Sequence, residues 1–428
     1  MCSDTEKDIK PDIKPANLTW NEASNVGRKA IDFITSSFAL KCRDGAMFSS
    51  QDDMSLLLLA DLVGYSPETG DAISRLMGTM GSELRLPSAD TALAALNATD
   101  ASELMSQFRH AVVRQLQSAD AVPDGYFIVA GDTHDVKRYS KKGVDASGRK
   151  RKADDLKYVR GTKPERSCSY AHKFITLEST MSGYTLDMHP HLPLSELPSG
   201  VSMMLDRTEA ACGRHIPLLL YDAAGYSAPF VTMLRRRKTD FIIRAPKNSA
   251  IKKLIAGRRG TYGAVIRDYQ IDGDADAPVN IVIASTELLR KHRMKLPLVD
   301  RKEKWITLAA DLSPAEGEED TAFMLRIARL YGKRWSVETS YRCIEDFHGE
   351  THSLHYQARY LLFAIAVLLY NAWVRCASAV KMTKYVMAFA FALILLDMPA
   401  LLNIVCNEAQ VSPGTVDPSV PPDGGGNM

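Results

Sequence analysis

The feature that most constrains the fold is a set of short, continuous apolar runs in the middle of the sequence. Leu218–Tyr221 is apolar at every position, and Phe241–Arg244 resembles it. A short run without alternation is typical of a strand buried on both faces, with helices covering the sheet. Tyr126–Ala130 is a similar β-type run. These runs predict an α/β protein with a mixed sheet.

Other segments complete this sheet and its connections. Phe174–Leu177 and Tyr184–Met188 are strand candidates, while Glu209–Gly213 and Ala228–Arg235 have the pattern of connecting helices. Between residues 248 and 312 the chain becomes strand-like again, which predicts a β-rich insertion. The segment before residue 120 is helical in pattern. Several short helices with tight turns suit a DNA-binding head, or equally a helical cap or a dimerisation element.

Composition and charge narrow the class of protein. Hydrophobic residues make up 46% and charged residues 24%, as in packed globular proteins, and the net charge of +2 excludes a uniformly basic coat. The seven cysteines include no CxxC pair, which favours a reducing cytosol over a disulfide framework. Met1–Pro15 is polar and has no signal-peptide pattern. Tyr360–Val374 is uncharged over 15 residues, shorter than the roughly 20 of a membrane span, so we expect a buried core helix.

Positive charge is concentrated in one segment. Residues 136–166 hold 12 basic and four acidic residues, about three times the basic content of an even spread. Such a segment is either a solvated surface loop or a loop that contacts phosphates. We predict DNA contacts from its basic residues Lys137, Arg138, Lys141, Lys142, Arg149, Lys150, Arg151 and Lys152.

Two aspartates follow apolar runs of the predicted sheet. Asp132 comes shortly after Tyr126–Ala130, and Asp222 directly follows Leu218–Tyr221. Sheet termini are where α/β proteins place their chemistry, and carboxylates without His or Cys partners suit a hard cation such as Mg²⁺. Aspartates also serve commonly as turn or cap residues. A two-metal phosphoryl-transfer site needs a third acid.

The third acid comes with a sharper pattern. Tyr331, Arg334 and Glu338 are spaced so that a helix places them on one face. A phenol, a cation and an acid on one face can hold a metal ion and a phosphate together. The alternative is an ordinary exposed Arg–Glu pair at a spacing of four.

Together these residues resemble the DDE transposases of bacterial and archaeal insertion sequences. Tyr331, Arg334 and Glu338 match the Tyr-x2-Arg-x3-Glu part of that family's Tyr-x2-Arg-x3-Glu-x6-Lys signature. The first acid resembles Asp132, with Asp135 as the alternative, and the second resembles Asp222. The spacings are 90 and 116 residues, and the longer one fits the β-rich insertion that such enzymes carry before the glutamate. The resemblance covers about residues 125–373.

The resemblance implies a fold and a mechanism. We expect an RNase H-like mixed sheet with a β-rich insertion, preceded by a helical N-terminal domain and followed by C-terminal helices. Asp132, Asp222 and Glu338 would be catalytic and would bind two Mg²⁺ or Mn²⁺ ions. Tyr331 and Arg334 would contact phosphates of the scissile strand.

One residue departs from the signature. Its lysine falls at position 345, where this chain has Glu345. Arg342 lies one helical turn earlier and is the basic residue placed to supply that DNA contact instead. The departure leaves the three acids unchanged.

The expected domains follow the chain in order. They are a disordered tail (1–16), a helical DNA-binding domain (17–122), the first part of the catalytic core (123–247), the β-rich insertion (248–315), the second part of the core with the C-terminal helices (316–410) and a disordered tail (411–428).

The resemblance also implies partners. We expect a cytoplasmic DNA transposase that acts on terminal inverted repeats and target DNA, as a homodimer in its synaptic complex and without a membrane. The alternatives are a nuclease of the same fold, a decayed transposase that only binds DNA, and a membrane protein built on the C-terminal apolar helices.

Overall fold

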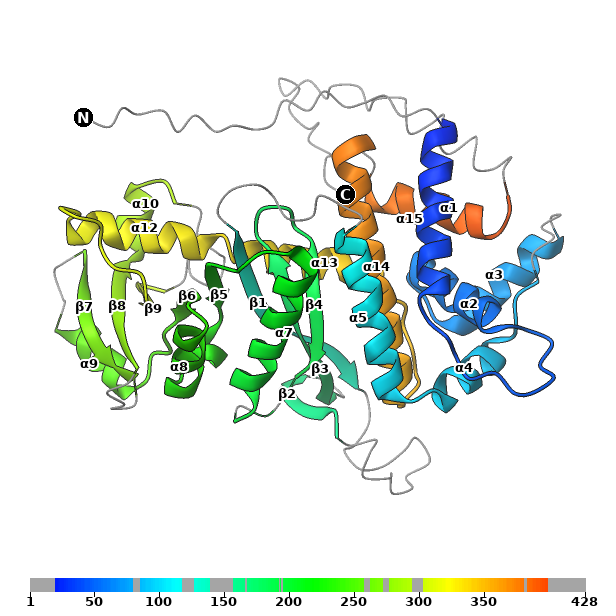
Figure 1. Ribbon diagram of the computed structural model, residues 1–428, viewed down its shortest axis with the longest axis horizontal. Coiled ribbons are helices and arrows are strands. Elements are labelled where there is room, and N and C mark those ends of the chain that lie inside the picture. The colour runs from blue at the N-terminus through cyan, green and yellow to red at the C-terminus, as the bar shows by residue number, and fades with distance from the viewer. Residues whose placement is uncertain are drawn as a thin grey trace, which may run out of the picture.

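The computed structural model describes residues 20–79, 85–117, 127–138, 157–165, 168–191, 193, 195–257, 262–271, 277–294, 303–380 and 383–398. The predicted tails at 1–16 and 411–428 lie outside these residues. So do six of the predicted DNA contacts: Lys141, Lys142, Arg149, Lys150, Arg151 and Lys152. Strands dominate one side of the molecule and helices the other (Figure 1).

The described strands form one continuous mixed sheet. They are β1 (Ile128–Arg138), β2 (Val159–Glu165), β3 (Cys168–Ser179), β4 (Thr185–Pro190), β5 (Leu218–Tyr221), β6 (Asp240–Arg244), β7 (Gly263–Gln270), β8 (Pro278–Ser285) and β9 (Trp305–Ala310). Their order is β2-β3-β1-β5-β6-β9-β8-β7, and β4 pairs with β3 outside this path. β1, β5 and β6 run parallel, whereas β3 is antiparallel to β1 and to β4. This is the mixed sheet that the apolar runs predicted, of the RNase H-like type that the resemblance implied.

The β-rich segment extends this sheet. β9 pairs antiparallel with β6, β8 with β9, and β7 with β8, so its strands continue the core. β9 is buried at every position, as its continuous apolar sequence requires. Its short helices are α9 (Ser249–Ala256) and α10 (Thr286–Lys291). The segment is therefore fused to the core through shared strand pairing.

Helices connect and cover the core strands. α7 (Leu197–Cys212) and α8 (Ala228–Arg236) lie beside the strands that they connect (Figure 1). α12 (Asp320–Gly332) packs on the outer strands β7 and β8, and α13 (Trp335–Glu345) packs on β1. The sheet thus carries α13, and with it Glu338, directly beside the strand of Asp132.

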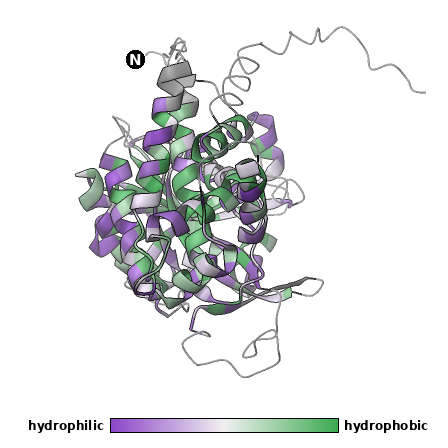
Figure 2. Cartoon of the chain, turned by 90° about the vertical axis from the view of Figure 1, so that its right-hand side faces the viewer, coloured by the Kyte–Doolittle hydropathy of each residue, from purple (hydrophilic) through white to green (hydrophobic). Residues whose placement is uncertain are grey.

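The N-terminal helices pack against the C-terminal ones. They are α1 (Trp20–Ser36), α2 (Ser50–Val63), α3 (Pro67–Thr79), α4 (Ala89–Ala98) and α5 (Ala101–Gln117). Ser88 caps α4, because its side chain accepts a hydrogen bond from the backbone N–H of Thr91. A buried amide pair joins the two regions, since Nδ2 of Asn371 donates to Oε1 of Gln115 at 3.0 Å. Seen from this end, the helices mix hydrophilic and hydrophobic residues, as expected for helices with one buried face (Figure 2).

The long apolar helix is a core helix. α14 (Tyr356–Val380) is long and apolar enough to cross a membrane, but 83% of the relevant window is buried inside the protein. It lies against α13 and against α2, α4 and α5. Each fully buried Leu, Ile or Phe contributes about 1.5–3 kcal/mol. α15 (Lys384–Leu395) then packs on α1 and α2.

Candidate active site

Two of the predicted acids stand side by side where β1 and β5 part. The parallel pairing of these strands ends with Gly131 opposite Tyr221. Asp132 and Asp222 are the next residues along the two chains, so the register brings both to the carboxyl edge of the parallel strands. Ligands of open α/β sheets bind outside this edge.

Asp132 does not end its strand, contrary to the prediction. β1 continues to Arg138 because it stays paired with β3, where Thr176 lies opposite Asp132. Only the pairing with β5 stops here. The apolar run ends before the strand does because β1 loses its neighbour β5 at this point. Beyond it, the residues of β1 alternate between a more buried and a more exposed side.

The signature residues do not share a single helix, which also corrects the prediction. α12 ends at Gly332 and α13 begins at Trp335. Between them the backbone tightens: the N–H of Arg334 donates to the carbonyl of Tyr331 at 3.0 Å, an i to i−3 bond. Arg334 keeps right-handed helical angles, so it and Glu338 remain neighbours one turn apart.

Arg334 bridges the first and third acids. Its Nη1 donates to Oδ2 of Asp132 at 2.6 Å, and its Nη2 donates to Oε1 of Glu338 at 2.5 Å. The side chains of Arg334 and Asp132 are only 11% and 16% exposed, against 32% for Glu338. The guanidinium also lies 5.6 Å from the ring centroid of Tyr331. These charge-assisted bonds tie the glutamate helix to the aspartate strand.

The environment of the acids raises their pKa values. Burial raises the pKa of Asp222 to about 6, and the negative charge of Asp132 acts in the same direction. The backbone N–H of Ala224, which donates to Oδ1 of Asp222 at 3.0 Å, opposes the shift. Burial also raises the pKa of Asp132, although Arg334 acts against it. Buried carboxylates that are short of positive charge form an environment that a cation relieves.

The cationic and phenolic groups keep their protons at neutral pH. Burial acts to lower the pKa of Arg334, but Tyr331, Asp132 and Glu338 outweigh it, so the pKa lies above its usual value. Burial raises the pKa of Tyr331 to about 12. Both residues are therefore hydrogen-bond donors toward an anion.

The donor set suits a hard divalent cation, because all three acids offer carboxylate oxygens. Among the residues that the structure describes, however, no three His, Cys, Asp or Glu side chains lie close enough together to hold a metal ion. The guanidinium of Arg334 lies between Asp132 and Glu338 and supplies the positive charge there. The residues fit Mg²⁺ or Mn²⁺ in chemistry, with an arginine between two of them.

Asp135, the alternative first acid, points away from this site. Successive residues of a strand face opposite sides, so Asp132 and His134 share one face and Asp135 lies on the other. His134 packs on Tyr341 of α13, with ring centroids 4.8 Å apart, which identifies the face that carries Glu338. Asp135 instead pairs with Lys173 of β3 at 3.3 Å.

The described DNA-contact candidates differ in exposure. Lys137 and Arg342 are exposed, whereas Arg138 is fully buried. The prediction for Arg138 is therefore corrected: it lies on the buried side of β1, where its guanidinium does not reach the surface. Arg342 follows Glu338 by four residues on α13, so both lie on one helix face.

Sequence reasoning missed Arg244 at the same sheet edge. In the parallel pairing of β5 and β6, Tyr221 lies opposite Ile243, so Arg244 stands next to Asp222. Its Nη2 donates to Oε2 of Glu303 at 2.9 Å. The signal was present in the sequence, because Arg244 ends a buried apolar run just as Asp222 follows one.

The mixed sheet, its two edge aspartates and a glutamate delivered by a later helix define an RNase H-like protein with a carboxylate site. A family model described as a transposase DDE domain matches residues 132–372, more than half of the chain. The chain therefore belongs to the DDE transposases, as the resemblance predicted.

The comparison with solved structures supports the fold. A cryo-EM structure of the piggyBac transposase synaptic complex with hairpin DNA matches with a TM-score of 0.55 and 12% identity. The match covers 92% of this chain and 87% of that one. No curated protein matches the sequence.

Proposed function

We propose that this transposase binds the ends of an insertion sequence and catalyses metal-dependent strand cleavage and strand transfer there. The observation that carries the proposal is the meeting of Asp132 and Asp222, on adjacent parallel strands, with Glu338 across the guanidinium of Arg334. Three acids from distant parts of the chain are thus gathered at one edge of the sheet, with Arg334 between two of them. The ion pairs of Arg334 with Asp132 and Glu338 do not need Asp222. Burying the carboxylate of Asp222 costs free energy unless a cation lies near it.

The three acids are the proposed ligands of two Mg²⁺ or Mn²⁺ ions. When bound, the ions supply activation of a water or a DNA 3′-hydroxyl and stabilisation of the leaving 3′-oxygen. The protein supplies position and charge. Asp132 and Asp222 are fixed by the strand register, and Glu338 is fixed by the seat of α13 on β1.

Arg334 has a second role in this proposal. Arg334 binds one oxygen of each of two proposed metal ligands, Oδ2 of Asp132 and Oε1 of Glu338, and would give up one of these bonds to reach a phosphate. A freed guanidinium has the planar fork that binds phosphate in a bidentate manner. Arg334 would thus exchange a carboxylate for a phosphate of the scissile strand. The ring of Tyr331 lies 5.6 Å from the guanidinium, and its protonated hydroxyl is proposed as a further donor.

The proposed substrate is double-stranded DNA, first the terminal inverted repeats and then the target. Arg342 on the Glu338 face of α13 and Arg244 at the sheet edge are described cations placed near the acids to contact its backbone. Lys137, exposed on the other face of β1, is a proposed contact away from the acids. The fold is shared with a transposase seen in a synaptic complex with hairpin DNA. Pairing two ends calls for a homodimer, acting in the cytoplasm on the cell's DNA.

Glu345 favours one alternative, a decayed transposase that binds DNA without cutting it. Glu345 ends α13, its side chain is 59% exposed, and its Oε1 lies 3.9 Å from Nε2 of His134. Burial lowers the pKa of His134 to about 4, so this imidazole is neutral and does not compensate the carboxylate charge. A negative charge at a DNA-facing position weakens binding to phosphates.

The test uses the purified protein with DNA that carries the flanks of its own gene, with Mg²⁺ or Mn²⁺. The proposal predicts cleavage at the element ends, loss of cleavage in Asp132→Ala, Asp222→Ala and Glu338→Ala, and a joined product with target DNA. Cleavage without joining would indicate a nuclease. Binding without cleavage would contradict the active enzyme, and Glu345→Lys would then be the first change to try.

A further inference from the structure

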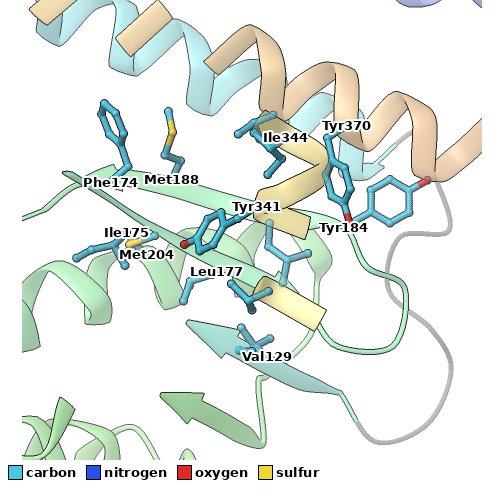
Figure 3. Close-up of a cluster of buried hydrophobic side chains, with 14 of the residues drawn as sticks. Val129, Phe174, Ile175, Leu177, Tyr184, Met188, Met204, Tyr341, Ile344 and Tyr370 are labelled. Carbon is cyan, nitrogen blue, oxygen red and sulfur yellow. The ribbon is translucent and has the colours of Figure 1, made fainter. Parts of the chain in front are cut away.

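A buried acid outside the metal site faces the glutamate helix. On β3, Thr176 and Glu178 are two residues apart and so lie on one face of the sheet. The hydroxyls of Thr176 and Tyr341 of α13 form a buried hydrogen bond of 2.7 Å. Figure 3 shows Tyr341 and Ile344 of α13 over this part of the sheet, near Leu177. Glu178 therefore points toward α13 as well.

Glu178 is almost completely enclosed. It is 1% exposed, and its Oε1 has no hydrogen-bond partner among the described residues. The hydroxyl of Ser336 on α13 is likewise buried without a partner there. Burial raises the pKa of Glu178 to about 8, against the opposing effect of the hydroxyls of Ser340 and Ser336. The carboxyl is thus protonated at neutral pH and can both donate and accept a hydrogen bond.

The titratable groups around Glu178 are neutral too. Tyr341 of α13 and Tyr370 of α14 both sense its charge, and burial raises the pKa of each. Tyr370 continues the polar contact, because its hydroxyl lies 2.7 Å from that of Ser340 and donates to the carbonyl of Gly183 at 2.9 Å. Among the described residues, no lysine or arginine charge acts on the pKa of Glu178.

The serines and the catalytic glutamate lie on opposite flanks of α13. The buried face of this helix contains Val337, Tyr341 and Ile344. At 100° per residue, Ser336 lies to one side of that face and Glu338 to the other. A small rotation of α13 about its axis therefore moves the two flanks in opposite directions relative to the sheet.

We propose that Glu178 is a positioning residue, whose carboxyl holds the Ser336–Ser340 flank of α13 and thereby sets where Glu338 stands relative to Asp132. The inference rests on the proposed function in treating Glu338 as a catalytic acid. Its physical basis is separate, because it concerns the seat of a helix on a strand. An ionised carboxylate in this enclosed space needs solvent, so ionisation of Glu178 loosens that flank and rotates Glu338 out of place.

The first test compares the pH profile of DNA cleavage for the unaltered protein and for Glu178→Gln, which keeps the shape and cannot ionise. The unaltered protein loses activity as the pH rises through about 8, by about tenfold one unit above that midpoint. Glu178→Gln keeps its activity at neutral pH and does not show this alkaline loss. Glu316→Gln, a change at an exposed glutamate, leaves the profile unaltered. The same alkaline loss in Glu178→Gln as in the unaltered protein would overturn the proposal.

The second test does not need activity, so it separates failure of this inference from failure of the proposed function. Hydrogen–deuterium exchange of the peptide spanning residues 335–345 is measured for both proteins at matched pH. We expect equal protection at pH 7 and faster exchange in the unaltered protein at pH 9. Equal exchange at both pH values would contradict the role of Glu178 even in a protein that cuts no DNA. Glu178→Leu tests whether filling the space is enough to hold α13. It removes the polar contact, so the helix should exchange faster at every pH.

Discussion

Gly131 lies against a buried ring directly behind the two aspartates, and one added methyl group tests how strictly the strand register sets the site. A Cβ at Gly131 would lie 2.5 and 2.7 Å from Cε2 and Cδ2 of Tyr221 and 3.2 Å from Cδ2 of Leu177. Tyr221 is fully buried, so its ring cannot swing into solvent. Gly131→Ala should therefore push β1 and β5 apart beside Asp132 and Asp222.

The size of this effect follows from two opposing contributions. Forcing a methyl group into a closely packed core costs about 1–3 kcal/mol. Replacing glycine by alanine also restricts the unfolded chain, which favours folding by about 0.4–1 kcal/mol. The expected net loss of stability is about 1–2 kcal/mol. The chain has 428 residues. At about 2 cal/mol/K of unfolding entropy per residue, each kcal/mol lowers the Tm of such a chain by about 1 °C, so a fall of about 1–2 °C is expected.

Thermal unfolding and Mn²⁺ titration measure the two consequences. Gly131→Ala should unfold earlier and bind Mn²⁺ more weakly, and a second change, Tyr221→Leu, should recover part of both. The matched control is Gly161→Ala on β2, where an added Cβ meets no atom within 4 Å. If Gly131→Ala matched the unaltered protein in both measurements, the strand register would not be what fixes the spacing of the acids.

Four further predictions concern the site and its helix. Asp222→Asn should raise the free energy of unfolding of the metal-free protein by about 1–3 kcal/mol above pH 6. The reason is that it removes a buried acid whose pKa is raised to about 6. Urea unfolding at several pH values should show this gain above pH 6 and none near pH 4. For the same reason, Mn²⁺ affinity of the unaltered protein, followed by calorimetry, should fall as the pH drops below about 6. Tyr341→Phe removes the buried bond to Thr176 and should cost about 1–3 kcal/mol in urea unfolding; no loss would mean that this bond does not help seat α13. Arg334→Gln leaves two acids without their shared cation, so Mn²⁺ should raise its Tm more than that of the unaltered protein.

The strands could be predicted because the local sequence of a buried strand is apolar. Leu218–Tyr221 and Phe241–Arg244 became β5 and β6, since a strand covered on both faces is apolar throughout. The three acids could be proposed as a site because two follow such runs and the third lies in a dense signature. The family followed from the same residues.

Features of the site that depend on pairing between distant segments could not be predicted from the sequence. Arg244 joins the site only through the register of β5 with β6, which no local pattern specifies. We predicted a DNA contact for Arg138 because it lies in a basic segment, yet β1 extends far enough to bury it. Glu178 directly follows the predicted strand Phe174–Leu177, and its burial depends on helices from a distant part of the chain. The break before Trp335 had a local signal in Gly332, a poor helix former that ends α12, but Lys333 and Arg334 after it are good helix formers.

The most direct test of the account is cleavage of a DNA end whose scissile phosphate carries one sulfur in place of a non-bridging oxygen. Mg²⁺ binds sulfur poorly and Mn²⁺ accepts it more readily. A metal ion that contacts this phosphate therefore makes the cleavage rate differ between the two metals. We predict cleavage of the sulfur-substituted end with Mn²⁺ but not with Mg²⁺. Asp132→Asn should abolish it, whereas Asp135→Asn, which alters the acid on the opposite face, should not. Equal cleavage with both metals, or unchanged cleavage by Asp132→Asn, would contradict a metal site built on these acids.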